Sequence, residues 1–208
     1  MRSKLPDTGT TIFTVMTRMA QQHNAINLSQ GFPDFDCPQA LRDRVTFYLN
    51  DRRNQYAAMT GVAELREQIA RKIQVLYGCT ADADQEITVT SGATEALFDA
   101  IQACVSTDDE VIMFDPAYDS YDPAVRLAGG VPVHIPLLLP EFRIDWQRLA
   151  DAINPKTRLI IINSPHNPSG SILGRQDLDS LAELIRERDI LVLSDEVYEH
   201  MVFDGGQH

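Results

Sequence analysis

From Glu86 onward, short apolar runs alternate with stretches of helical periodicity, and this alternation limits the possible folds more than any other feature. Runs so short, apolar and free of polar alternation suit strands buried on both faces of a mainly parallel sheet. Helices then cover the sheet, as in an α/β domain. The predicted strands are EITVT, EVIMFD, VPVHIP, TRLIII and ILVLSD, and the predicted helices lie near residues 94–104, 118–128, 145–153 and 176–188.

The first third of the chain has a different pattern. Apolar residues recur with helical spacing, which predicts three helices joined by loops. The repeating positions fall within residues 12–19, 41–49 and 65–76, the last of them just before Gly78. We therefore expect residues 1–30 to form an N-terminal arm with a first helix, and residues 31–208 to belong to the sheet-containing domain.

The charge of the chain argues against polyanionic partners. Acidic side chains outnumber basic ones by 30 to 18, a formal net charge of -12. Such a charge repels nucleic-acid backbones and anionic membrane surfaces. The basic group of Arg42, Arg44, Arg52 and Arg53 is interpreted as a solvated helix face. We expect partners that are neither nucleic acid nor membrane.

Cysteine usage and the start of the chain indicate a cytoplasmic location. Cys37, Cys79 and Cys104 are odd in number and form no paired CxxC pattern, which suggests neither a disulfide framework nor a metal site. The first residues lack the apolar core of a signal peptide, and no later stretch approaches the roughly 20 apolar residues of a membrane span.

Unusual residues follow the predicted strands, where ligands bind in α/β sheets. SGATEA places small residues, a hydroxyl and backbone N–H groups at a strand-to-helix turn, which suits an anion. Ordinary helix capping by the same residues is an equal alternative. The chain contains neither GxGxxG nor GxxxxGK[ST], so dinucleotide and nucleoside-triphosphate binding lose their main support.

Two further segments carry polar groups at strand ends. In NSPHNPSG, Asn163 and Asn167 flank a proline-containing turn and could donate to a ligand oxygen, although the same residues are common in turns without function. Asp195 follows ILVLS directly, so a carboxylate stands at the mouth of a buried strand. It could pair with a protonated ring nitrogen, or it could cap a helix.

Six segments together resemble the class I/II aminotransferases, fold-type I enzymes that depend on pyridoxal 5′-phosphate. The resemblance is greatest to the methionine and kynurenine (glutamine-type) branch. The segments occur in the family's order and spacing between residues 30 and 200, and they are QGFPDF, QYAAMTG, SGATEAL, DPAYDSY, NSPHNPSG and SDEVYEH. The resemblance implies a fold-type I PLP-transferase large domain, truncated here, with a helical N-terminal arm.

The resemblance also implies roles for individual residues around the cofactor. The backbone of Ala93 and the side chain and backbone of Thr94 would hold the phosphate. Tyr118 would stack on the pyridine ring. Asn167 and Tyr198 would bond the phenolic oxygen, and Asp195 would pair with the pyridinium nitrogen, where it keeps the electron sink charged. Asp195, Tyr198 and Asn167 are thus the expected catalytic residues.

Substrate and partner residues follow from the same resemblance. Gly31 would lie near the substrate carboxylate, and Asn167 would also contact the substrate. Tyr56 would reach the cofactor phosphate of a neighbouring subunit, which implies a homodimer with shared sites.

The chain departs from the family in lacking the lysine that forms a Schiff base with the cofactor. That lysine lies in an SxxK-type motif beyond SDEVYEH, and Lys4, Lys72 and Lys156 match no such motif. The arginine that binds the substrate carboxylate in the C-terminal small domain is also missing. A fragment, a truncated reading frame and a pseudoenzyme all remain open, and we expect the 208 residues alone to be inactive.

We consider three alternative functions for a chain with these motifs. The first is transfer of the amino group of a methionine-like, glutamine-like or aromatic amino acid to a 2-oxo acid. The second is carbon–sulfur β-lysis of cysteine conjugates on the same fold. The third is a ligand-sensing domain fused to a DNA-binding module, for which residues 1–30 offer no room.

Overall fold

The computed structural model describes residues 3–31 and 33–208, and these form two compact units. The first, here called the sheet unit, comprises the described residues of Met1–Thr8 together with Ser91–His208. The second, here called the helical unit, comprises the described residues of Gly9–Thr90. The expected boundary between an arm and a large domain, at residues 30 and 31, stays a prediction.

The sheet unit contains a four-stranded parallel sheet in the order β2-β1-β3-β4. β1 (Glu110–Asp115) lies between β2 (Val131–Pro136) and β3 (Thr157–Asn163), and β4 (Leu191–Asp195) pairs with β3. These are four of the five predicted strands. The mainly parallel α/β arrangement expected from the apolar runs is confirmed.

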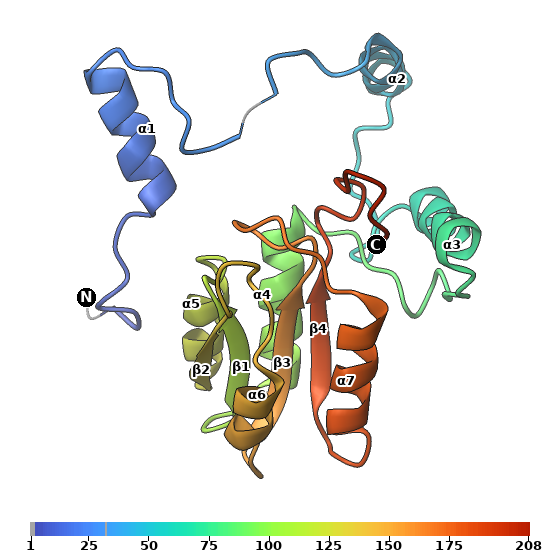
Figure 1. The fold of residues 1–208 in the computed structure, drawn as a ribbon. Coiled ribbons are helices and arrows are strands. Elements are labelled where there is room, and N and C mark those ends of the chain that lie inside the picture. Colours follow the sequence, from blue (N-terminus) through green and yellow to red (C-terminus); the bar gives the residue numbers. More distant parts are fainter. Residues whose placement is uncertain (1–2, 32) are drawn as a thin grey trace. The chain divides into compact units, whose positions relative to one another are not determined.

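Helices cover both faces of this sheet (Figure 1). α4 (Ala93–Cys104) and α5 (Tyr121–Ala128) pack on one face, and α6 (Trp146–Ala152) and α7 (Arg175–Ile185) pack on the other. Successive side chains of β1 point to opposite faces of the sheet, because side chains alternate along a strand. Val111 and Met113 join the α4 and α5 cluster, while Ile112 and Phe114 join the α6 and α7 cluster. This double burial explains the apolar runs in the sequence.

The predicted strand EITVT does not form. Residues 87–90 carry no strand pairing, and the Val89 N–H donates instead to the Thr60 carbonyl at 3.0 Å. A strand exists only when a neighbour supplies its ladder of hydrogen bonds. Among the described residues no strand offers that ladder to residues 86–90, so an apolar run alone was insufficient.

The helix expected at residues 118–128 begins later, at Tyr121. Tyr118, Asp119 and Ser120 form a turn in which the Tyr121 N–H donates to the Tyr118 carbonyl at 3.2 Å. Turn-forming Asp and Ser compete with the first helical bonds. Tyr118 is therefore carried on a loop at the strand ends.

The order of the strands reverses between β1 and β3. The chain passes from β1 to β2 on one side, then crosses to β3 on the other side of β1. Such a reversal opens a crevice beyond the carboxyl ends of the two central strands, and ligands of open α/β sheets bind there. The segments after β1 and β3 are DPAYDSY and NSPHNPSG, two of the segments chosen from the sequence.

The helical unit contains α1 (Ile12–Gln22), α2 (Gln39–Asn50) and α3 (Ala63–Tyr77), so the three helices predicted for the first third are confirmed. α1 begins where the Thr11 hydroxyl accepts from the Thr14 N–H. α3 ends at Gly78, whose φ of 67° is the left-handed conformation that favours glycine.

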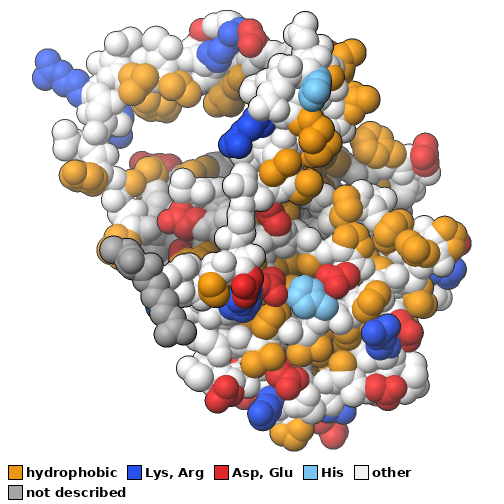
Figure 2. Space-filling model, turned by 90° about the vertical axis from the view of Figure 1, so that its left-hand side faces the viewer, with side chains coloured by type: hydrophobic (Ala, Val, Ile, Leu, Met, Phe, Trp, Pro, Cys, Tyr) orange, Lys and Arg blue, Asp and Glu red, His pale blue; other side chains and the backbone are white. Residues whose placement is uncertain are grey.

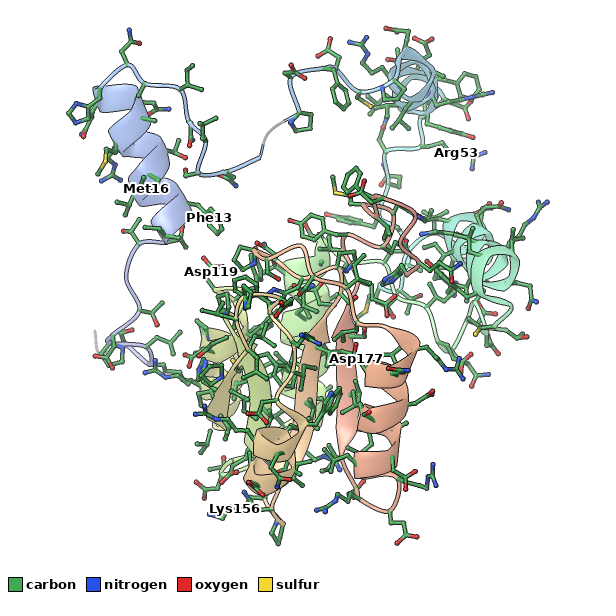
Figure 3. All side chains as sticks on the ribbon, in the orientation of Figure 1. Phe13, Met16, Arg53, Asp119, Lys156 and Asp177 are labelled. Carbon is green, nitrogen blue, oxygen red and sulfur yellow. The ribbon has the colours of Figure 1, made fainter. Side chains whose placement is uncertain are left out.

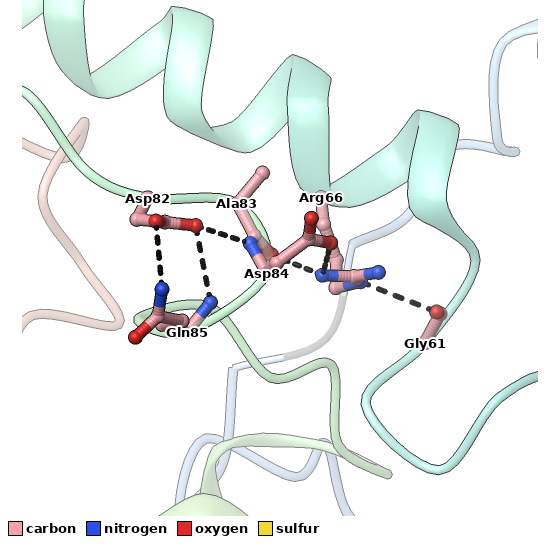
Figure 4. A network of polar contacts seen from close by, with 6 residues as sticks. All are labelled: Gly61, Arg66, Asp82, Ala83, Asp84 and Gln85. Carbon is pink, nitrogen blue, oxygen red and sulfur yellow. Dashed lines mark hydrogen bonds and ion pairs between the residues drawn. The ribbon is translucent and has the colours of Figure 1, made fainter.

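A buried arginine organises the start of α3 (Figure 4). The Arg66 guanidinium donates to the carbonyls of Gly61 and Ala83, and its Nη1 lies 2.9 Å from an Asp84 carboxylate oxygen. Only 8% of the Arg66 side chain is exposed. Several donors are thus satisfied at once, as a buried cation requires.

The surface is mixed in character. On the face shown in Figure 2, Lys and Arg side chains are dispersed among acidic and hydrophobic ones. Within residues 3–31 and 33–208, none of the helices has the length and apolar character needed to cross a membrane.

Candidate active site

A pocket of about 230 Å³ lies at the carboxyl edge of the sheet. All the cofactor residues predicted within the sheet unit contribute to it, together with Leu97, Asn163 and Val197. Those predicted residues are Ala93, Thr94, Tyr118, Asn167, Asp195 and Tyr198. The structure therefore brings together residues from four segments that span 105 positions, from Ala93 to Tyr198. Gly31 and Tyr56 belong to the helical unit, and their roles stay predictions.

One wall of the pocket is the amino terminus of α4. Its N-cap is Gly92, with a φ of 86°, and no side chain caps the helix. The Glu95 carboxylate accepts from the Ser91 N–H before the helix begins. Side-chain capping by Ser91 or Thr94 is thus the wrong interpretation of SGATEA. The uncapped first turn and its positive dipole end favour an anion beside Ala93 and Thr94.

Asp195 supplies the negative charge of the pocket. It ends β4 and is only 8% exposed. Its Oδ2 accepts from the Tyr121 hydroxyl at 2.6 Å, and its Oδ1 accepts from the Val197 N–H at 3.2 Å. No helix follows Asp195 within residues 196–208, so the helix-cap alternative is wrong.

The carboxylate of Asp195 has no cationic partner among residues 91–208. A buried charge of this kind is costly unless an opposite charge approaches it. Each carboxylate oxygen accepts one hydrogen bond and retains capacity for another. The residue therefore fits a ligand that brings a positively charged N–H into the pocket.

Asn163 fixes the geometry of the pocket floor. Its carboxamide Nδ2 donates to the Asp195 carbonyl at 2.8 Å, and its Oδ1 accepts from the Asn167 N–H at 2.7 Å. The expectation that both asparagines serve a ligand is thus only partly supported, because Asn163 joins β3, β4 and the following turn. The Asn167 side chain forms no hydrogen bond within the described residues of the sheet unit and lines the pocket.

Tyr121 is a buried side chain beside the pocket that the sequence did not single out. Tyr121 is 3% exposed, and its ring lies edge-on to that of Tyr118 with centroids 5.7 Å apart. Burial, followed by the hydrogen bond to Asp195, raises the pKa of Tyr121 far above its ordinary value. Its hydroxyl is therefore protonated and donates to the carboxylate. The only sequence signal for this role is its place in DPAYDSY.

His166 connects the turns that follow β1 and β3. Its Nε2 lies 3.0 Å from the Pro116 carbonyl oxygen, and its Nδ1 lies 2.7 Å from the Ser169 hydroxyl. A carbonyl only accepts, so Nε2 carries the proton and Nδ1 accepts from Ser169. Burial lowers the pKa of His166, although the bond to Pro116 opposes this effect. The neutral ring holds the Tyr118 loop against the Asn167 turn.

The pocket therefore has two chemically distinct ends. A buried carboxylate lies at one wall, a helix terminus without a side-chain cap at another, and the Tyr118 ring and the Asn167 carboxamide also line the pocket. This set suits a flat ring that carries a protonated nitrogen and an anionic group. The residues present fit pyridoxal 5′-phosphate, which carries both a ring nitrogen that can be protonated and an anionic phosphate.

Comparison with known proteins agrees with this geometry. The family model of aminotransferase class I and II matches residues 23–208. Methionine aminotransferase of Escherichia coli is 54% identical over 207 residues, covering 100% of this chain and 54% of the relative. Human kynurenine–oxoglutarate transaminase 3 is 37% identical over 208 residues, covering 95% of this chain and 46% of that protein.

A solved structure from Escherichia coli, described as identifying a methionine aminotransferase function, superposes with a TM-score of 0.93 at 55% identity. The match covers 96% of this chain and 52% of that one. The chain thus spans about half the length of the relatives it matches. Both the fold and the motifs lead to one conclusion: the chain belongs to the class I and II aminotransferases, fold-type I enzymes that use pyridoxal 5′-phosphate.

Proposed function

We propose that the protein carrying this chain transfers the amino group of an L-amino acid to a 2-oxo acid, with pyridoxal 5′-phosphate as its cofactor. The observation that carries the proposal is the buried Asp195 carboxylate, which has no cationic partner among residues 91–208 and lies in a pocket walled by the α4 terminus. When bound, the cofactor supplies an electron sink for the carbanion left as the α-proton departs. The residues of this chain determine how well that sink works.

Each pocket residue has a proposed task. Ala93 and Thr94 bind the phosphate through the α4 terminus, and Tyr118 covers the face of the ring. Asn167 and Tyr198 donate to the phenolic oxygen. Asp195 keeps the proton on the ring nitrogen, because its buried charge stabilises a cation beside it.

The proposed amino donor is methionine-like, glutamine-like or aromatic, and methionine is the first to test. The similarity to the Escherichia coli methionine aminotransferase supports this choice. We place the protein in the cytoplasm. The cofactor-linking lysine and the substrate-binding arginine belong, by this proposal, to sequence beyond residue 208, as does the remainder of the large domain and the small domain.

The experiment is turnover by the purified protein that carries this chain, loaded with cofactor and supplied with methionine and a 2-oxo acid. The proposal expects the new amino acid and the 2-oxo acid of methionine in equal amounts. Pyruvate and ammonia from a cysteine conjugate, without amino transfer, would instead establish β-lyase activity. Residues 1–208 alone should show no turnover and no borohydride-fixed cofactor on Lys4, Lys72 or Lys156.

A homodimer with shared sites is part of the proposal, with Tyr56 contacting the cofactor phosphate bound by the partner. Mixed dimers of Tyr56→Ala and Asp195→Ala chains test it. If Tyr56 acts across the interface, one site in each mixed dimer is intact, and activity recovers toward about half of the unmutated level. If Tyr56 serves its own chain, mixed dimers show only the average of the two weak parents.

A further inference from the structure

The contact between Tyr121 and Asp195 joins two residues 74 positions apart. Tyr121 is the first residue of α5, and Asp195 is the last residue of β4. The oxygen atoms are 2.6 Å apart, within the range of a charge-assisted O–H···O⁻ bond. Only 3% of Tyr121 and 8% of Asp195 is exposed, so water does not compete for either group.

The direction of this bond follows from the two groups. Burial and the neighbouring carboxylate both raise the pKa of Tyr121, so the phenol keeps its proton and donates it. The second carboxylate oxygen accepts from the Val197 backbone N–H. Asp195 is thus held by one donor on each oxygen, and Tyr121 is the only side chain among residues 91–208 that donates to it.

A donor to a carboxylate stabilises its ionised form and weakens its hold on a proton. The effect is large where the surroundings are apolar and dry. Around this contact the packing is apolar: Tyr121 belongs to the buried cluster that includes Leu97, Val125 and Ile161. Removing the phenol would therefore take away a buried donor that favours the charged carboxylate.

We propose that Tyr121 is a positioning residue that holds the Asp195 carboxylate and stabilises its negative charge, and thereby determines how completely the ring nitrogen of bound pyridoxal 5′-phosphate retains its proton. This inference rests on the proposed function, because it concerns the same pocket. With Tyr121, the proton shared between ring nitrogen and carboxylate lies on the nitrogen. Without it, the proton shifts toward the carboxylate, and the electron sink is weaker.

The test uses the holoenzyme carrying this chain, reconstituted with cofactor that is ¹⁵N-labelled in the pyridine ring. In Tyr121→Phe the ¹⁵N resonance should move toward the position of an unprotonated ring, at unchanged pH. Loss of one charge-assisted bond should lower kcat about tenfold, with a smaller change in KM. An unchanged resonance in a cofactor-loaded Tyr121→Phe enzyme would overturn the inference.

Val125→Ala is the matched control. Val125 lies one turn beyond Tyr121 on α5, is fully buried in the same cluster, and has a hydrocarbon side chain that cannot donate to Asp195. This change should lower thermal stability and leave the ¹⁵N resonance where it is. If Val125→Ala moved the resonance as far as Tyr121→Phe does, the effect would be general loosening of α5, and the inference would be wrong.

A second variant avoids dependence on the folding of Tyr121→Phe. 3-Fluorotyrosine at position 121 keeps the ring and the hydroxyl but makes the hydroxyl a stronger donor. The ¹⁵N resonance should then move in the opposite direction, toward the fully protonated ring; no movement would contradict the inference. If the unmodified enzyme bound cofactor with an unprotonated ring, or bound none, the proposed function itself would fail.

Discussion

At the amino ends of the strands, a hollow of about 850 Å³ is lined by Lys156, Arg158, Arg188, Asp109 and Asp189, whereas the pocket at the carboxyl ends measures about 230 Å³. Figure 3 shows the two ends through Lys156 and Asp119, which lie at opposite edges of the sheet. The larger space also has more charged residues. It is nevertheless the smaller pocket that matches a ligand.

The difference lies in how the charged groups are satisfied. At the amino end, Arg158 pairs with Asp189 at 2.8 Å and Asp109 accepts from the Ser106 N–H at 2.8 Å. Asp189 is 95% exposed, so water solvates it as well. At the carboxyl end, Asp195 is buried and has no cationic partner among residues 91–208. A site is indicated by an uncompensated buried group rather than by volume or by charge count.

The largest expected effect is that of Asp195→Ala in the holoenzyme. It should lower turnover per bound cofactor by at least about a hundredfold, since it removes control of charge in the electron sink. Cofactor occupancy should fall much less, because the phosphate and ring contacts remain. Turnover and cofactor absorbance are measured on the same samples. Turnover per bound cofactor close to that of the unmutated enzyme would show that the buried Asp195 carboxylate does not control catalysis.

A smaller effect is expected from His166→Leu, which leaves the Pro116 carbonyl without its donor and removes one of the partners of the Ser169 hydroxyl. Unfolding free energy should fall by about 1–3 kcal/mol, the cost of unsatisfied buried polar groups. Cofactor affinity should weaken several-fold as the Tyr118 loop loosens.

The same variant should change how stability depends on pH. The folded pKa of His166 is lowered from 6.5, so the unfolded chain binds the proton more readily. Stability is therefore lost as pH falls from 6.5 toward the lowered pKa. His166→Leu should remove this part of the acid dependence. Identical pH profiles for His166→Leu and the unmutated holoenzyme would show that His166 titrates normally.

The smallest effect is expected at the amino end, from Arg158→Gln. Its ion pair with Asp189 is largely exposed and contributes about 0–1 kcal/mol. Turnover and cofactor affinity should be unchanged within error, and the melting temperature should move only slightly. A pronounced loss of turnover would show that the amino-end hollow takes part in function.

The sequence predicted the sheet well where burial alone determines a strand. Residues such as Val111 to Phe114 are buried on alternating faces, so their apolar run contains the necessary information. EITVT is also rich in β-branched residues but forms no strand, since pairing depends on a neighbour that its own residues do not specify. The start of α5 was misplaced for a local reason, the turn from Tyr118 to Ser120.

In the site, too, some residues could be predicted from local sequence and others depend on distant partners. Residues within short motifs, such as Thr94, Asn167 and Asp195, could be selected because strand ends and family resemblance mark them. Tyr121 and His166 could not, because their partners lie 74 and 50 positions away and only the fold brings them together. The sequence also left open whether Asp195 caps a helix, and only the course of the chain after β4 resolved this question.

The most direct test of the central claim is a crystal structure of the holoenzyme that carries this chain. We expect the ring nitrogen of pyridoxal 5′-phosphate to lie within about 3 Å of an Asp195 carboxylate oxygen. We expect the phosphate at the first turn of α4, beside Ala93 and Thr94. A cofactor bound elsewhere, or turned so that its phosphate meets Asp195, would contradict the roles proposed for Asp195 and α4.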